Sequence, residues 1–274
     1  MVLPTKIGDP PLKMAGRSKN EKVLGFVLLQ ELLLEKAKEA LLTIVEETGQ
    51  LEALFLVGLP VDKDGRLYNV AAVLYRGRIL GMIPKKNIPM YAEFYEGRHF
   101  TPGEETVTEY RLGKQEIPFG TNLLFRCEEL PELILGCELC EDLWVAEPPS
   151  TSHALMGATV IANLSASNET VSKDDYRTLL VKASSARLLC GYIYTSAGEG
   201  ESTQDLVFGG HDLIAENGTL LAQSARFTTG ILYTDLDVLK ISSERRRMGT
   251  FGKRPMKPYL TVPFSMQLTG TKLD

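Results

Sequence analysis

The sequence has little excess charge, few cysteines and no long apolar run, and each absence excludes a class of protein. The formal net charge of the 274 residues is -5, which gives no strong electrostatic attraction to nucleic acid or to an anionic membrane. No apolar stretch is long enough to span a bilayer, and the proline-broken N-terminus lacks the apolar core of a signal peptide. We therefore expect a cytoplasmic protein that binds neither nucleic acid nor membrane and acts on a small molecule.

The 4 cysteines and 3 histidines are too few and too scattered to suggest a disulfide framework or a metal site. Cys137 and Cys140 form a Cys-x-x-Cys pair, which is typical of a redox site or of half a zinc site. No second such pair and no paired histidines follow it. We therefore predict that the cysteines are thiols and that no metal is bound.

The motifs of several common enzyme classes are also missing. The sequence has no G-x-S-x-G elbow and no G-x-x-x-x-G-K-[ST] phosphate loop, and its glycines do not match a dinucleotide fingerprint. A serine hydrolase that uses His211 and Asp212 has no motif to support it. These absences leave cysteine chemistry as the alternative to examine.

The apolar pattern predicts an α/β domain with layered sheets and outer helices. Residues 1–22 are polar and proline-broken and predict a loose arm, and residues 23–274 predict one domain. Helices are expected at residues 26–48, 152–157, 174–190 and 241–248. Strands are expected at residues 53–59, 70–75, 79–83, 133–139, 160–164, 192–196, 206–214, 219–223 and 233–236.

Cys140 is the candidate nucleophile because it follows the predicted strand 133–139 directly and an acidic turn comes after it. Strand ends commonly display active-site groups, and a thiol attacks an amide well when a base or a positive charge lies nearby. The alternative is a buried core cysteine, which is the commoner environment for this residue type. We favour that alternative for Cys127, Cys137 and Cys190.

Two other segments carry candidate site residues. Residues 84–103, PKKNIPMYAEFYEGRHFTPG, form an aromatic loop in which Lys85 is placed to neutralise an oxyanion or, alternatively, is a solvated surface lysine. Residues 163–167, NLSAS, follow a strand and offer hydroxyl and backbone N–H groups to a substrate carboxylate or amine. Alternatively, those groups only cap the next helix.

Taken together, these segments resemble the nitrilase superfamily, whose members use a Glu-Lys-Cys triad, and within it the glutaminase domain of glutamine-dependent NAD+ synthetases. The matching segments are PKKNIPMYAEFYEGRHFTPG, GCELCEDLW, NLSASNE, AGEGESTQDLVFGGHDLIAENGTLLAQSARF and RRRMGTF, from about Leu28 to about Phe251. The resemblance implies an α-β-β-α sandwich that pairs with a second copy, and so a homo-oligomer.

The resemblance also implies roles for individual residues. Cys140 matches the nucleophile that forms a glutamyl thioester, Lys85 the residue that stabilises the oxyanion, and Glu96 the additional carboxylate after the lysine. The positions that hold glutamine correspond to Tyr91, Glu141, Ser167 and Lys173. Related sequences often carry arginine where Lys173 stands, and lysine keeps the charge but loses a bidentate grip on a carboxylate.

The chain departs from the family pattern at its start. The family opens with a strand, a helix and a second strand that ends in a Pro-Glu motif, whose glutamate is the general base, and this chain joins the pattern only at the following helix. Neither Pro131-Glu132 nor Glu147-Pro148 matches that motif. Loss of a general base lowers a rate by roughly 100- to 10,000-fold. A catalytically inactive fragment or regulatory partner is therefore an alternative hypothesis.

The other departure is at the far end, where the sequence stops before the ATP pyrophosphatase domain of a complete synthetase. ATP and Mg²⁺ belong to that domain, and the glutaminase step needs no cofactor. The resemblance thus predicts glutamine hydrolysis that supplies ammonia to a NAD+ synthetase domain as partner. A hydrolase of another small amide is a further alternative, against which the EFYE and GEGEST segments argue.

Overall fold

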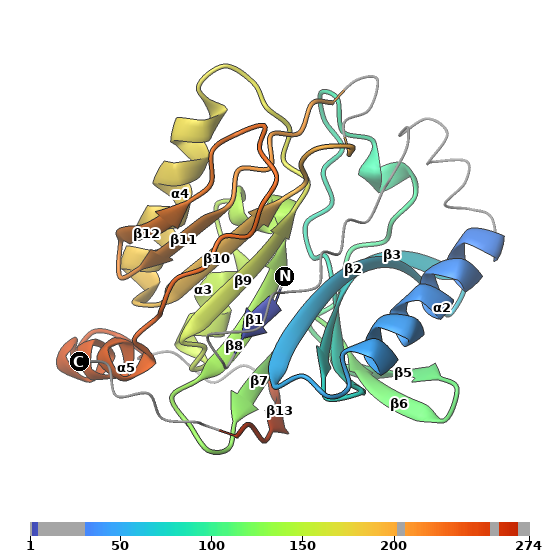
Figure 1. Ribbon diagram of the computed structural model, residues 1–274, viewed down its shortest axis with the longest axis horizontal. Helices are drawn as coiled ribbons and strands as arrows, with labels where there is room; N and C mark the ends of the chain where they lie inside the picture. Colours follow the sequence, from blue (N-terminus) through green and yellow to red (C-terminus); the bar gives the residue numbers. More distant parts are fainter. Residues whose placement is uncertain (1, 5–30, 202–205, 253–257, 268–274) are drawn as a thin grey trace.

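The computed structural model describes residues 2–4, 31–201, 206–252 and 258–267, which form two β-sheets packed face to face with helices outside (Figure 1). The helices are α2 (Glu31–Glu47), α3 (Pro149–Leu155), α4 (Lys173–Leu188) and α5 (Val238–Arg247), with two 3-10 turns, η1 (Glu96–Arg98) and η2 (Cys140–Leu143). None of the helices in these ranges is long and apolar enough to cross a membrane.

The first sheet has six strands in the order β1-β2-β3-β4-β6-β5. Its strands are β1 (Val2–Pro4), β2 (Ala53–Lys63), β3 (Arg66–Tyr75), β4 (Arg78–Pro84), β5 (Thr108–Leu112) and β6 (Gln115–Phe119). The second sheet has seven strands in the order β12-β11-β10-β9-β8-β7-β13. Its strands are β7 (Leu123–Cys127), β8 (Ile134–Leu139), β9 (Val160–Ser165), β10 (Gly191–Ser196), β11 (Leu213–Glu216), β12 (Thr219–Gln223) and β13 (Leu260–Phe264).

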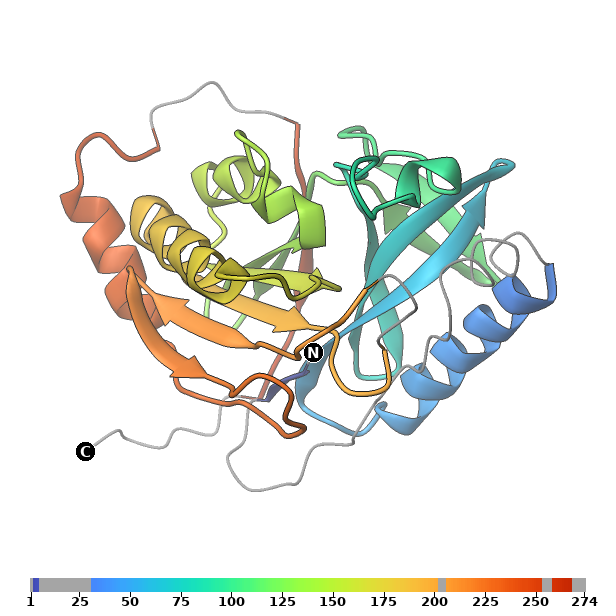
Figure 2. The same ribbon diagram turned by 90° about the horizontal axis from the view of Figure 1, so that it is seen from above.

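The central strands, such as β3, are apolar on both faces because both faces are covered. Along β3, Val70 and Leu74 pack in a cluster with Leu41 of α2, whereas Val73 packs with residues of the other sheet, including Phe125. Viewed from above, α2 lies outside the first sheet and α3 and α4 lie outside the second (Figure 2). This is the expected α-β-β-α sandwich.

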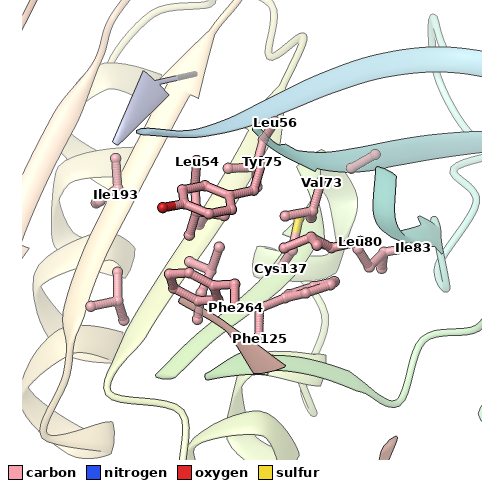
Figure 3. Packing of buried hydrophobic residues seen from close by; sticks show 14 of the residues in the cluster. Leu54, Leu56, Val73, Tyr75, Leu80, Ile83, Phe125, Cys137, Ile193 and Phe264 are labelled. Atoms are coloured by element: carbon pink, nitrogen blue, oxygen red, sulfur yellow. The ribbon is translucent and has the colours of Figure 1, made fainter. Parts of the chain in front are cut away.

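The core between the sheets is built from both of them (Figure 3). Tyr75 of β3 and Phe264 of β13 meet with ring centroids 5.5 Å apart. Phe125 of β7 is fully buried and lies against Gly81 of β4, where an added Cβ would approach its ring to 3.0 Å. Because the contact is this close, any separation or sliding of the sheets would lose packing energy.

Three parallel strands bring the ends of distant segments to one edge. β8 pairs with β9, and β9 with β10, in parallel register, so their carboxyl ends lie together. Two tight turns predicted from sequence also form: Arg76-Gly77 and Asn217-Gly218 have positive φ at both positions, as two-residue hairpin turns with the right twist require.

Several predicted elements need correction. Residues 2–4, expected in a loose arm, pair with β2, and residues 5–22 lie outside the described part. The expected helix 26–48 is described only from residue 31. Residues 233–236 form no strand: Leu236 packs against the core from an irregular segment, whereas residues 233–235 are exposed. Residues 206–212 contribute only one bridge, between Phe208 and Asn168, because the ladder of the predicted hairpin begins at Leu213.

Candidate active site

Cys140 stands where β8 ends and η2 begins, and its backbone is left-handed, with φ 46. The side chain is half-buried, and its backbone N–H donates to Asn163 Oδ1 at 3.1 Å. Cys137, three residues earlier, lies in the core between the sheets, where burial raises the pKa of its thiol far above the ordinary value. The two cysteines of the Cys-x-x-Cys pair therefore occupy different environments, and all four cysteines are free thiols.

Lys85 follows β4 of the opposite sheet and is only 2% exposed, so the expected alternative of a solvated lysine is wrong. Its ammonium forms an ion pair with Glu96, which also accepts a hydrogen bond from Asn69 Nδ2 at 2.6 Å. Burial lowers the pKa of Lys85, but the negative charges of Cys140, Glu96 and Asp142 outweigh burial and the net pKa is raised. Lys85 is therefore a fixed positive charge near the thiol.

A cavity of about 400 Å³ opens beside Cys140. Its lining includes all four residues predicted to hold a substrate: Tyr91, Glu141, Ser167 and Lys173. The Tyr91 hydroxyl donates to the two carboxylate oxygens of Glu141, at 2.8 and 3.0 Å. Burial raises the pKa of Glu141 despite this bond and the nearby positive charges of Lys85 and Lys173.

Lys173 begins α4 and points its ammonium between two aromatic rings. The ammonium lies 5.7 Å from the ring centroid of Phe94 and 5.2 Å from that of Trp144, and it donates to Asn168. Burial lowers the pKa of Lys173, and the Arg177 charge adds to this, while the Cys140 charge opposes it. The ammonium is held within the cavity wall instead of projecting into solvent.

Asp142 ties the two loops of the site together. Its carboxylate accepts hydrogen bonds from the backbone and side-chain nitrogens of Asn87, at 2.9 and 2.8 Å, and from Leu139 N–H at 3.0 Å. Burial raises the pKa of Asp142, although these bonds oppose the rise. The loop that carries Lys85 is thereby fastened to the turn that carries Cys140.

The structure thus brings Tyr91, Glu141, Ser167 and Lys173 together around the cavity beside Cys140 and adds other residues. Lys85 and Glu96 are not among the residues that line this cavity, and Lys85 acts on Cys140 through its charge. Phe94, Trp144 and Tyr176 line the cavity but were not selected, although the first two lie within the matched segments. Asn163 contacts Cys140 but was considered only as the start of a substrate segment. The aromatic residues near Cys140 in the sequence could have indicated part of the cavity lining. Nothing local in the sequence indicates the role of Asn163.

Comparisons with known proteins show the family of the chain. Residues 25–246 match the family described as "Carbon-nitrogen hydrolase". The chain belongs to the carbon-nitrogen hydrolase family. Its members are enzymes, and this carbon-nitrogen hydrolase domain places a thiol, a buried lysine and a carboxylate at one edge of its sandwich.

Curated relatives of this carbon-nitrogen hydrolase domain include the glutamine-dependent NAD(+) synthetase of Mycobacterium tuberculosis, 45% identical over 244 residues. That match covers 88% of this chain and 35% of the relative. The corresponding protein of Mycobacterium leprae is 40% identical over 266 residues, covering 94% of this chain and 38% of the relative. The chain therefore spans little more than a third of the length of these relatives.

Solved structures support the same fold for this carbon-nitrogen hydrolase domain. The glutamine-dependent NAD(+) synthetase of Cytophaga hutchinsonii superposes with a TM-score of 0.66 at 26% identity, over 76% of this chain and 33% of that one. A carbon-nitrogen hydrolase of Helicobacter pylori superposes with a TM-score of 0.64 at 21% identity, over 87% of this chain and 78% of that one. The second match shows the sandwich fold alone.

Proposed function

We propose that this domain hydrolyses the side-chain amide of glutamine through a thioester on Cys140. The observation that carries the proposal is the shared cavity: Cys140 lines it together with a carboxylate, Glu141, and an ammonium, Lys173. Free glutamine carries one ammonium and one carboxylate. These two wall charges of opposite sign suit such a ligand better than a neutral amide.

The reaction balances without a cofactor. Cys140 Sγ bonds to the amide carbon, and the amide oxygen becomes an oxyanion that the Lys85 ammonium stabilises; such a charge contributes about 2.7–4 kcal/mol. The carbon–nitrogen bond then breaks, and the nitrogen leaves as ammonia with the proton that the thiol lost. Water attacks the thioester, glutamate departs, and the thiol is restored.

Within the proposal, Glu96 holds Lys85 in place, because the two form a largely buried ion pair. Glu141 and Tyr91 bind the substrate ammonium, and Lys173 and Ser167 bind its carboxylate. The ammonia serves ATP-dependent NAD+ synthesis from deamido-NAD+ in a synthetase domain that binds ATP and Mg²⁺. That partner is supported by the names of the relatives. A homo-oligomeric assembly is also part of the proposal and rests on the family resemblance alone.

A second candidate is a regulatory domain that binds glutamine without turnover. One observation favours it: among the described residues, no carboxylate forms a hydrogen bond with the Cys140 thiol. Pro131-Glu132 precedes β8 whereas Cys140 follows it, so a strand on the order of 20 Å long separates that glutamate from the thiol.

A glutamine-mimicking chloroketone, together with a measurement of ammonia release, distinguishes the two. We expect it to add one label to the chain, mapped to Cys140, and glutamine to slow the labelling. Cys140→Ser should abolish the label, and Cys190→Ala, which changes a buried cysteine far from the cavity, should retain it.

Release of ammonia from glutamine is measured in the same samples. Protected labelling with ammonia release supports the hydrolase, and protected labelling without release supports the regulatory domain. Labelling that glutamine leaves unchanged contradicts both and points to another small amide.

A further inference from the structure

The backbone of Cys140 has an unusual conformation, and the buried side chain of Asn163 bonds to its N–H. A positive φ disfavours residues with a Cβ and persists only where the surroundings impose it. The Cys140 N–H donates a hydrogen bond to Asn163 Oδ1, which also accepts from Ser165 Oγ at 2.7 Å. Asn163 is fully buried, so its amide has no water to turn toward.

Strand register places three buried polar side chains side by side behind the nucleophile. Glu138 of β8 and Asn163 of β9 are direct partners across parallel strands. Asn163 is also the partner of Tyr194 on β10, which puts Tyr192, two residues earlier, on the same face. This face lies toward α3 and α4, away from the core between the sheets.

The hydrogen bonds among Glu138, Tyr192 and Asn163 fix the orientation of the Asn163 amide. Ionised Glu138 only accepts hydrogen bonds, from the Tyr192 hydroxyl and, at 2.7 Å, from Ser150 N–H. Because Tyr192 gives its proton to Glu138, its oxygen must accept, and Asn163 Nδ2 faces it at 3.4 Å. The amide oxygen of Asn163 is then forced toward Cys140, where an N–H needs an acceptor.

We propose that Asn163 is a positioning residue for the nucleophile, held in the required amide orientation by Tyr192 and Glu138. The inference rests on the proposed role of Cys140. Asn163 does not touch the substrate; it fixes the backbone from which the thiol projects toward the cavity and toward Lys85. The Cys140 N–H is occupied by this bond and does not serve the oxyanion.

Two substitutions in the whole chain test the proposal. Asn163→Leu removes the acceptor. Glu138→Gln keeps the shape of the side chain but introduces an NH₂ group. If this NH₂ group faces Ser150, two donors oppose each other. If it faces Tyr192 instead, the Tyr192 hydroxyl must donate to Asn163, and the Asn163 amide turns so that its NH₂ group faces Cys140. The matched control is Ser185→Ala, which removes a similarly buried hydroxyl that donates to Cys190 O at 2.7 Å, away from the cavity.

The readout is alkylation of Cys140 by iodoacetamide, followed by peptide mapping at pH 8, above the pKa of about 7 to which burial raises Glu138. We expect the rate to fall about tenfold or more in both variants, because a displaced thiol no longer projects toward the cavity in the reactive position. Ser185→Ala should alkylate at the wild-type rate.

The proposal is overturned if a variant with either substitution is alkylated at the wild-type rate while its circular dichroism spectrum shows that it is folded. If Asn163→Leu does not fold, Glu138→Gln and Tyr192→Phe decide in the same way. Iodoacetamide acts without glutamine, so failure of glutamine to protect Cys140 would contradict the proposed function and leave this comparison valid.

Discussion

Lys85 and Lys86 are neighbours in the chain with opposite environments. Lys85 is buried against Glu96, whereas the Lys86 side chain is 35% exposed and pairs with Glu105 at 2.7 Å. Lys85→Met removes the charge beside Cys140 and should slow chloroketone labelling and ammonia release about 100-fold or more. Lys86→Met breaks only a surface pair, worth at most about 1 kcal/mol, and should leave both rates unchanged. Equal effects of the two substitutions would argue against a role for Lys85 at the thiol.

The buried carboxyl group of Glu138 should make the stability of the fold depend on pH. Burial, and then the Asp142 charge, raise its pKa from 4.5 to about 7. At pH values between these two pKa values, the folded chain binds more protons than the unfolded chain. The free energy of unfolding therefore falls as pH rises through this range, by on the order of 3 kcal/mol for this one group.

Urea denaturation at pH 5 and pH 8 measures this fall. Glu138→Gln cannot titrate and should show a smaller fall than the wild type. Substituting the exposed Glu104 by Gln should leave it unchanged. A Glu138→Gln chain with the wild-type difference would place the pKa of Glu138 near its ordinary value.

The site residues differ in how far the sequence could reveal them. Cys140 and Lys85 each follow an apolar run, so an expected strand end and a reactive residue type sufficed to select them, and the family resemblance supplied the rest. Asn163 was not recognised as the partner of Cys140, nor Tyr192 as the partner of Asn163, because these contacts depend on the register of three strands that are distant in sequence. No pattern along the chain encodes that register.

At the scale of elements, α4 is fixed to the substrate segment by one buried arginine. Arg177 donates to Glu169 Oε1 at 2.9 Å, to Ser167 Oγ at 3.2 Å and to His211 Nδ1 at 2.9 Å. Because an arginine only donates, His211 must accept at Nδ1 and is neutral, in keeping with a pKa lowered by burial and by the Arg177 charge. Ser167 must likewise accept from Arg177 through its hydroxyl oxygen.

Arg177→Met should therefore destabilise the chain by about 3–5 kcal/mol, because it leaves the Glu169 carboxylate buried without this partner. Urea denaturation measures the loss. Arg187→Met, on the exposed surface of the last turn of α4, is the control and should stay within about 0.5 kcal/mol of the wild type. A small effect of Arg177→Met would mean that water or Arg226, 3.8 Å from Glu169, replaces the lost charge.

The elements were predicted best where apolar runs are continuous. β8, β9 and β10 are buried on both faces and were found within a residue or two of their ends. The hairpin of β5 and β6 was missed because it alternates exposed charges with few apolar residues. β13 was missed because it is short, contains a proline and pairs with β7, which lies more than a hundred residues earlier.

At the scale of the whole molecule, the site is assembled across the sandwich. Lys85 extends from β4 of the first sheet and Cys140 from β8 of the second, so the spacing of the sheets sets the distance between charge and thiol. Residues that fix this spacing should therefore affect both stability and reactivity, although they lie in the core.

Gly81 of β4 offers the test. A Cβ there would meet the Phe125 ring at 3.0 Å and Leu123 Cδ1 at 3.2 Å, both on β7 of the opposite sheet. Gly81→Ala should push the sheets apart, destabilise the chain by about 1–3 kcal/mol and slow chloroketone labelling of Cys140. Gly58→Ala, on β2, meets nothing within 4 Å and should change neither quantity. If Gly81→Ala loses stability while Cys140 labels at the wild-type rate, the loops joined by Asp142 hold the site together independently of the sheets beneath them.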